Sequence, residues 1–189
     1  KPIDAFKKVI APNGERILMH ASNFRKIKRV QDVVKIFNEV NKTIPSKLLF
    51  VGDGPERSTA EDLSRELGIF EEVRFVGKQE QMEDILAIAD LFLLTSEYES
   101  FGLAALEAMA AGVPVVSTNA GGLAEINIPG QTGYMGNIGD VETMSNYALE
   151  ILMNDATLNK FKHNAEKHAR QFDISNIVPI YEKLYERFL

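Results

Sequence analysis

The sequence has no cysteine, no tryptophan and only three histidines among its 189 residues. Without cysteine the chain can form no disulfide and offers no thiolate as nucleophile or metal ligand. This composition suits a reducing interior, so we expect a cytoplasmic protein. No run approaches the roughly 18 apolar residues of a transmembrane segment. The net charge of -6 disfavours extended contact with the phosphates of a nucleic acid.

The three histidines do not form a metal-binding pattern. His163 and His168 are five residues apart on a predicted helix, so they do not share one face, and we expect both in solvent. His20 follows an apolar run and precedes Ser22, which suggests a hydrogen-bonded wall residue. We therefore expect neither a metal site nor a bound cofactor.

The chain does contain enough apolar sequence for a core. Hydrophobic residues make up 45% and charged residues 25% of it, which suits one globular domain. It begins with KPIDAFKK, without an initiator methionine or a basic-then-apolar leader. We interpret it as part of a longer protein, and its oligomeric state is left open.

Short apolar runs alternate with helical patterns. Apolar residues recur every three or four positions over residues 29–43, and the pattern repeats over residues 61–67, 81–89 and 103–111. Strands that are apolar throughout and separated by helices indicate a parallel sheet covered on both faces. We predict a doubly wound, Rossmann-like α/β fold with about six strands: RILMHAS, KLLFVGDG, VRFVGK, LFLLTSE, PVVSTNAGG and GYMGN.

The sequence after Asp140 predicts only helices, over residues 140–155, 156–172 and 174–189. We assign residues 1–172 to the Rossmann-like domain. We expect residues 173–189 to form a C-terminal helix that packs against the sheet or back towards a missing N-terminal domain.

The loops that follow the predicted strands are polar. In an open parallel sheet, ligands bind in the crevice at the carboxyl ends of the strands. Five such loops on one rim favour a polar, extended ligand: SNFRKIKR, GDGPE, GKQ, SEYESFG and STNAGG.

The fourth of these loops leads into a helix that begins near Ser100, Phe101, Gly102 and Leu103. Free backbone N–H groups and the dipole of a first helical turn suit a phosphate. Glu99 precedes this turn, and Glu107 follows eight residues later, roughly 12 Å along a helix. A nucleoside diphosphate sugar could place its sugar at one glutamate and its ribose at the other.

A ligand-free interpretation fits these two glutamates equally well. Glu99 could be a favourable charge at a helix start, and Glu107 could face solvent. The first loop favours a ligand, because Arg25, Lys26 and Lys28 with Arg29 place four cations within five residues of an acidic protein. Such cations neutralise a diphosphate leaving group without a metal, although one or two could simply be solvated.

The second loop, GDGP, contributes Gly52 and Gly54. This motif is also ordinary turn sequence. We nevertheless expect both glycines to border the site.

Glu99 and Glu107 within ESFGLAALE, followed by EAMAAGVPVVSTNAGGLAEI and GQTGYM, resemble the nucleotide-sugar-binding half of retaining family-4 glycosyltransferases. The resemblance extends from Ile17 to about Phe172. It implies one half of a GT-B enzyme, with residues 1–172 as the donor-nucleotide domain. SNFRKIKRVQDV and KLLFVGDGPE are most similar to members that transfer N-acetylglucosamine from UDP-GlcNAc to L-malate in bacillithiol synthesis.

The resemblance implies roles for the matching residues. Glu99 would contact the hydroxyls of the donor sugar, with Phe101 and Gly102 beside it and Ser100 in the same binding segment. Glu107 would hold the ribose. The diphosphate would meet backbone N–H groups, and the uracil would face the loop after the third strand. The residues concerned are Leu103 and Ala104 for the diphosphate, and Val76, Lys78 and Gln79 for the uracil.

The catalytic set implied by the resemblance is Glu99, Arg25 and Lys28. Lys28 matches a phosphate-binding lysine of the family. Many relatives have arginine where this chain has Asn23, so either Asn23 or Arg25 could contact the diphosphate. The implied reaction is a front-side displacement that retains configuration and uses no metal. The acceptor site would lie mainly in the N-terminal domain, so this chain alone would be inactive.

Three alternative functions bear on this interpretation. A nicotinamide-dependent dehydrogenase should have G-x-G-x-x-G after its first strand, and ASNFRKIKR lacks it. A non-catalytic nucleotide-sugar-binding domain would keep the same binding residues. A glycosyltransferase with a lipid or polysaccharide acceptor also remains open.

Overall fold

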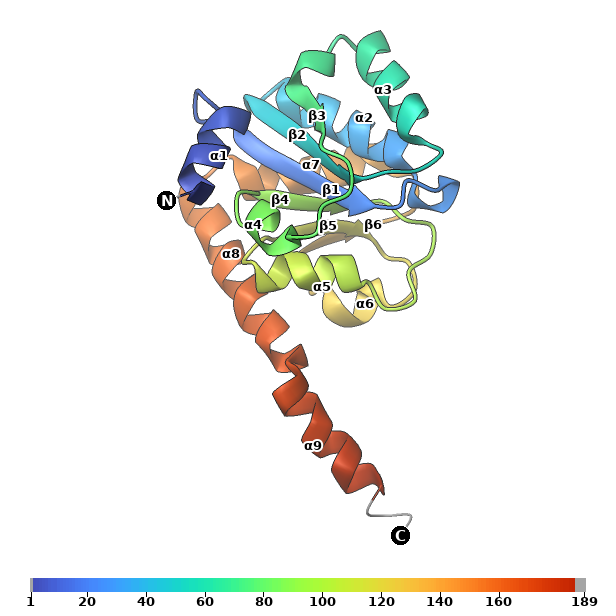
Figure 1. The fold of residues 1–189 in the computed structure, drawn as a ribbon, viewed down its shortest axis with the longest axis vertical. Helices are drawn as coiled ribbons and strands as arrows, with labels where there is room; N and C mark the ends of the chain where they lie inside the picture. Colours follow the sequence, from blue (N-terminus) through green and yellow to red (C-terminus); the bar gives the residue numbers. More distant parts are fainter. Residues whose placement is uncertain (1, 186–189) are drawn as a thin grey trace.

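The computed structural model describes residues 2–185 as an α/β domain with one long C-terminal projection (Figure 1). The strands are β1 (Arg16–Ser22), β2 (Ser46–Gly52), β3 (Val73–Phe75), β4 (Leu91–Leu94), β5 (Val115–Thr118) and β6 (Gly133–Gly136). The α-helices are α1 (Pro2–Ile10), α2 (Val30–Asn41), α3 (Arg57–Glu66), α4 (Met82–Leu86), α5 (Leu103–Ala110), α6 (Leu123–Ile126), α7 (Val141–Leu152), α8 (Asp155–Ala169) and α9 (Ile174–Tyr185). Short 3-10 turns are η1 (Lys26–Lys28), η2 (Phe70–Glu72) and η3 (Arg170–Phe172).

The six strands form one sheet in the order β3-β2-β1-β4-β5-β6, and every neighbouring pair is parallel. The chain builds outward from β1 to β3 and then crosses back to β4 on the other side of β1. The predicted doubly wound parallel sheet is therefore confirmed. The reversal between β1 and β4 is a topological switch point, where such sheets bind ligands.

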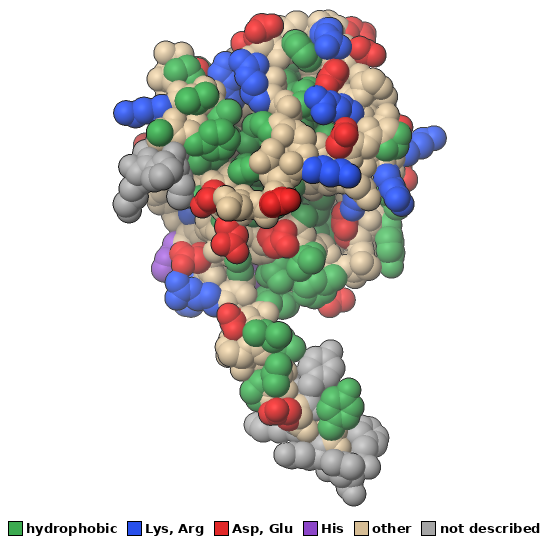
Figure 2. All heavy atoms as spheres, viewed as in Figure 1, with side chains coloured by type: hydrophobic (Ala, Val, Ile, Leu, Met, Phe, Trp, Pro, Cys, Tyr) green, Lys and Arg blue, Asp and Glu red, His purple; other side chains and the backbone are tan. Residues whose placement is uncertain are grey.

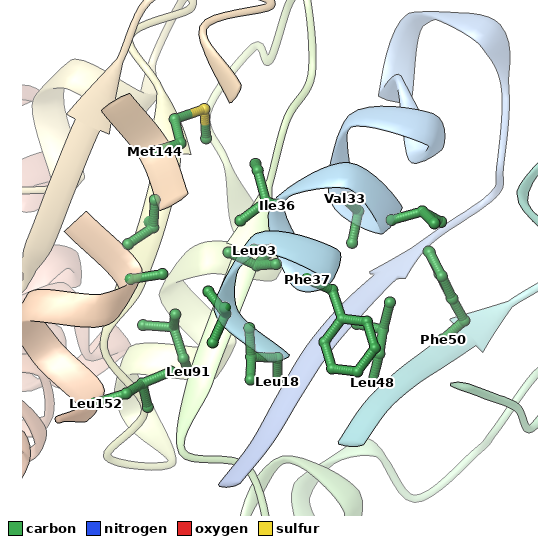
Figure 3. Close-up of a cluster of buried hydrophobic side chains, with 14 of the residues drawn as sticks. Leu18, Val33, Ile36, Phe37, Leu48, Phe50, Leu91, Leu93, Met144 and Leu152 are labelled. Atoms are coloured by element: carbon green, nitrogen blue, oxygen red, sulfur yellow. The ribbon is translucent and has the colours of Figure 1, made fainter. Parts of the chain in front are cut away.

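Each central strand buries side chains on both faces of the sheet. Along β4, Leu91 and Leu93 pack on one face, and Phe92 and Leu94 pack on the other. The first face is covered chiefly by α2 and α7, as the cluster around Phe37 shows (Figure 3). The second face is covered by α4, α5, α6 and α8. Apolar runs without polar alternation fold in this way because both sides of each strand are buried.

Helix α8 packs against α5 and α7 and ends at η3, after which α9 runs away from the domain (Figure 1). The exposed side chains of α9 include Ile174, Val178, Leu184 and Tyr185. Its docking on an N-terminal domain stays a prediction. Helix α1 has no counterpart among the predicted elements. Within residues 2–185, none of the helices combines the length and apolarity needed to cross a bilayer.

Candidate functional site

Two loops meet at the switch point. We call residues 23–29, after β1, the Lys28 loop, and residues 95–102, after β4, the Glu99 loop. Between them lies a hollow of about 310 Å³, the charged hollow. It brings eight of the predicted site residues together with three residues from the strand ends: Asn23, Lys28, Glu99, Ser100, Phe101, Gly102, Leu103 and Ala104 with Ala21, Ser22 and Leu94.

A charged pair lies in this hollow. Lys28 Nζ donates to Glu99 Oε1 at 2.5 Å, and Ser96 Oγ donates to the same oxygen at 2.7 Å. Only 19% of the Lys28 side chain and 15% of the Glu99 side chain are exposed. Because a half-buried carboxylate needs such partners, Glu99 is held in a defined position. The two residues were predicted to bind different parts of a donor, and the structure places them in direct contact.

The loop after β5 packs against the backbone of the Glu99 loop. The Gly122 N–H donates to the Glu99 carbonyl at 2.8 Å. Gly121 has a φ of +57°, and a Cβ placed on it would lie 2.0 Å from that carbonyl oxygen. Only glycine fits here, because any side chain would displace the backbone of Glu99. These two glycines were not among the predicted site residues, although STNAGG, the run just before Leu123 that contains them, is one of the five loops predicted to surround the ligand.

Helix α5 begins at the charged hollow. Gly102 is its N-cap, with a φ of 87°, and a Cβ there would approach Leu123 Cδ2 to 2.6 Å. The N–H groups of the first helical turn, at Leu103 and Ala104, have no preceding turn to bond to. They therefore give this end of the hollow an electropositive surface.

A chain of hydrogen bonds through His20 and Ser22 fixes the backbone next to Asn23. His20 Nδ1 lies 2.9 Å from the Leu93 carbonyl, which can only accept, so Nδ1 carries the proton. The hydroxyl of Ser22 then donates to His20 Nε2 at 2.8 Å and accepts from the Phe24 N–H at 3.1 Å. Burial lowers the pKa of His20 to about 4, so the ring stays neutral at pH 7. His20 is hydrogen-bonded as expected, but it is fully buried and does not itself line the charged hollow.

Gly52 and Gly54 lie behind the Lys28 loop. A Cβ at Gly52 would lie 1.9 Å from the Ser22 carbonyl oxygen, and a Cβ at Gly54 would lie 2.0 Å from that of Asn23. Both glycines therefore lie against the backbone of Ser22 and Asn23, which line the charged hollow, and do not line it themselves. Arg25 is exposed and lies outside the charged hollow, so its phosphate contact stays a prediction.

Glu107 is exposed on α5 and lines a second hollow of about 920 Å³, the acidic hollow. Acidic side chains gather over α4 and the adjoining end of α5 (Figure 2). The loop from Val76 to Gln79 leads directly to Glu80 and Gln81 on the wall of this hollow. Gln79 Nε2 donates to the Val76 carbonyl at 2.7 Å, which folds the loop back on itself. The two glutamates thus line separate hollows, Glu99 from the loop before α5 and Glu107 from within α5.

One expectation about the histidines is wrong. His163 is exposed, but His168 is half-buried, with its ring centroid 5.3 Å from that of Phe172. Phe172 is also 6.1 Å from the ring of Phe101. The cause is the 3-10 turn η3, which directs Phe172 back onto the domain. Across the described part of the chain, no three His, Asp or Glu side chains are grouped as metal ligands would be.

The family model described as "Glycosyl transferases group 1" matches residues 3–168, and the chain belongs to this family. Over 173 residues it is 44% identical to N-acetyl-alpha-D-glucosaminyl L-malate synthase of Bacillus anthracis, which covers 91% of this chain and 45% of the relative. It is 32% identical to 2-deoxystreptamine N-acetyl-D-glucosaminyltransferase of Niallia circulans, over 79% of this chain and 40% of that protein. The chain thus spans less than half the length of these relatives.

Solved structures share the fold. HepE of Anabaena in complex with UDP superposes with a TM-score of 0.88 at 24% identity, covering 97% of this chain and 52% of HepE. Sucrose-phosphate synthase of Thermosynechococcus elongatus gives a TM-score of 0.84 at 26% identity, over 97% and 48% of the two chains. The domain therefore has the architecture of one half of a two-domain glycosyltransferase.

Proposed function

We propose that this chain is the donor-binding half of a retaining glycosyltransferase that transfers N-acetylglucosamine from UDP-GlcNAc to L-malate. The observation that carries the proposal is the arrangement along α5. An ammonium–carboxylate pair lies at the N-terminus of the helix, and a further glutamate faces a separate hollow eight residues on. The 44% identity to the L-malate synthase supports the choice of donor and acceptor.

The donor spans the two hollows in this proposal. Its diphosphate lies at the first turn of α5, where the N–H groups of Leu103 and Ala104 and the ammonium of Lys28 supply positive charge. Glu99 accepts hydrogen bonds from the sugar, beside Phe101 and Gly102. At the other end Glu107 accepts from the ribose, and the backbone of residues 76–79 faces the uracil.

Lys28 exchanges partners when the donor binds. In the ligand-free site its ammonium neutralises Glu99; with a diphosphate present it turns to the phosphate oxygens and leaves the carboxylate to the sugar hydroxyls. As the bond from the sugar to UDP breaks, negative charge grows on the leaving phosphate. Lys28 and the start of α5 stabilise that charge, a role that requires no metal. Either Asn23, which lines the same hollow, or Arg25 makes a further contact to the diphosphate in this proposal.

The acceptor is bound mainly by an N-terminal half that is not part of this chain. Helix α9 docks on that half in our proposal. Its exposed apolar side chains and its direction away from the sheet support this role (Figure 1). The 189 residues alone then bind donor but transfer nothing.

The test compares the 189-residue chain with the longer enzyme that contains it. The chain should bind UDP and UDP-GlcNAc in calorimetry, and the longer enzyme should release UDP when given UDP-GlcNAc and L-malate. NMR of the product should show the anomeric configuration of the donor. Tighter binding of NAD than of UDP would contradict the proposal. Transfer to a lipid or polysaccharide but not to malate would contradict the acceptor, and binding without any transfer would indicate a non-catalytic domain.

A further inference from the structure

Arg29 is one of two cations of the Lys28 loop, with Lys26, that the donor proposal leaves without a role, and its side chain is the less exposed of the two. Its φ of 48° places it in the left-handed region, and Phe24 is the other non-glycine residue with positive φ among residues 2–185. A residue with a Cβ rarely adopts this backbone conformation, which persists only where contacts with neighbouring residues stabilise it. Arg29 directly follows Lys28 and forms the N-cap of α2.

The guanidinium of Arg29 bridges two carboxylates from different parts of the fold. Its Nε donates to Asp32 Oδ2 at 2.6 Å, and its Nη1 donates to Glu97 Oε1 at 3.0 Å. Asp32 is buried in the first turn of α2, with 8% of its side chain exposed. Glu97 belongs to the Glu99 loop. The hydrogen bond to Asp32, together with the one to Glu97, raises the pKa of Arg29.

Backbone contacts join the same two loops. The Thr95 hydroxyl lies 2.9 Å from the Lys28 carbonyl and 3.0 Å from the Arg29 carbonyl. The Glu97 N–H donates to the Ile27 carbonyl at 2.8 Å. The backbone on both sides of Lys28 is thus fixed to the segment that leads to Glu99, and the Arg29 side chain adds a charged bond across the same junction.

We propose that Arg29 is a positioning residue of the donor site, whose bridge from Asp32 to Glu97 fixes the Lys28 loop against the Glu99 loop. This inference rests on the proposed function. Arg29 touches no part of the donor. It keeps the Lys28 ammonium and the Glu99 carboxylate on one side of the charged hollow, so the diphosphate meets a preformed site. The acidic hollow at Glu107 has no part in this bridge.

The substitution Arg29→Gly tests the inference with little risk to the fold. Glycine adopts a φ of 48° freely, so the backbone is retained while the guanidinium is lost. We expect the Kd of UDP to rise at least tenfold and the Kd of uridine to stay within twofold, because uridine lacks the diphosphate. Arg29→Lys should recover part of the loss, since an ammonium reaches one carboxylate but cannot bridge two as a planar guanidinium does.

The matched control is Arg65→Ala. Arg65 also pairs with two carboxylates, Asp62 at 3.0 Å and Glu61 at 3.6 Å, but it lies on α3 and lines neither hollow. Its Kd values for UDP and uridine should match those of the unsubstituted protein. Urea unfolding of every variant shows that the folded state is the one being titrated.

A second variant, Glu97→Gln, removes the negative charge that Arg29 pairs with in the Glu99 loop and leaves the backbone bonds between the two loops in place. UDP should bind several-fold more weakly to it. It decides the inference should Arg29→Gly fail to fold. An unchanged Kd of UDP in the folded Arg29→Gly protein, or in Glu97→Gln, would overturn the inference. So would an equal loss of uridine, which would show general damage to the domain. Failure of the unsubstituted protein to bind either compound would instead refute the proposed function.

Discussion

The ammonium of Lys28 lies 2.5 Å from the carboxylate of Glu99, although 71 residues separate them in the sequence. The pair occupies the place where we propose that the diphosphate and the sugar of the donor meet. Donor binding must therefore separate two charges that stabilise each other in the free protein. Substitution of Lys28 should affect binding of the diphosphate, whereas substitution of Glu99 should affect the transferred sugar.

Lys28→Met should weaken UDP binding by about 10- to 150-fold, because a hydrogen bond to a charged group contributes about 1.5–3 kcal/mol. Titration calorimetry at constant ionic strength measures the change. Lys26→Met is the control within the same loop, because Lys26 is exposed and does not line the charged hollow. Equal losses in the two variants would show that the loop acts through its total charge and would contradict a specific role for Lys28.

Gly121→Ala should destabilise the protein and impair UDP binding. The new Cβ would overlap the Glu99 carbonyl, and alanine would also adopt a left-handed φ at a cost of about 1–2 kcal/mol. Gly130→Ala is the matched control, because its φ is +74° and nothing lies within 4 Å of the added Cβ. It should show the backbone cost alone in urea unfolding, with normal UDP affinity. Equal effects at the two glycines would refute the supporting role of Gly121.

His20 should make the folded state less stable in acid. Its pKa is lowered from 6.5 to about 4 by burial, so the unfolded chain binds the proton more readily. Stability is therefore complete above pH 6.5 and falls as the pH drops towards 4, by roughly 3 kcal/mol from this group. His20→Gln keeps an amide donor for the Leu93 carbonyl but does not titrate. Its unfolding free energy should decline less between pH 7 and pH 4, whereas parallel curves would contradict the assignment.

UDP binding should be unchanged by EDTA, because Lys28 and the start of α5 supply the positive charge at the diphosphate. Calorimetric titrations with and without the chelator, after exhaustive dialysis, make the comparison. A strict requirement for magnesium or manganese would show that the proposed charge balance is incomplete.

The fold could be predicted because its signals are local. The run RILMHAS coincides with β1, because a mainly apolar run between polar loops is typical of a strand that is buried on both faces of a sheet. The start of α5 at Leu103 was also predicted, from the helical pattern of apolar residues over residues 103–111. Helix α1 was missed, because nothing in PIDAFKKVI showed what its apolar face would pack against.

The side-chain partners in the site could not be predicted, because they depend on contacts between distant segments. Four cations in the Lys28 loop suggested a phosphate site, but composition cannot show that Lys28 faces Glu99 while Arg29 bridges Asp32 and Glu97. His168 was placed in solvent for the same reason, since its contact with Phe172 depends on the turn at η3. The loop sequences were enough to predict where the site lies, but which side chains pair within it depends on tertiary packing.

The most direct test of the account separates its two glutamates in the longer enzyme, assayed with UDP-GlcNAc and L-malate. Glu107→Ala should weaken the binding of both UDP and UDP-GlcNAc by roughly 1.5–3 kcal/mol, because both ligands contain the ribose. Glu99→Ala should leave the Kd of UDP unchanged or lower it, because Lys28 loses the partner that competes with the diphosphate. It should lower kcat, because the Glu99 carboxylate lies beside the transferred sugar. If Glu99→Ala loses UDP binding as severely as Glu107→Ala while kcat stays normal, the placement of the donor along α5 is contradicted.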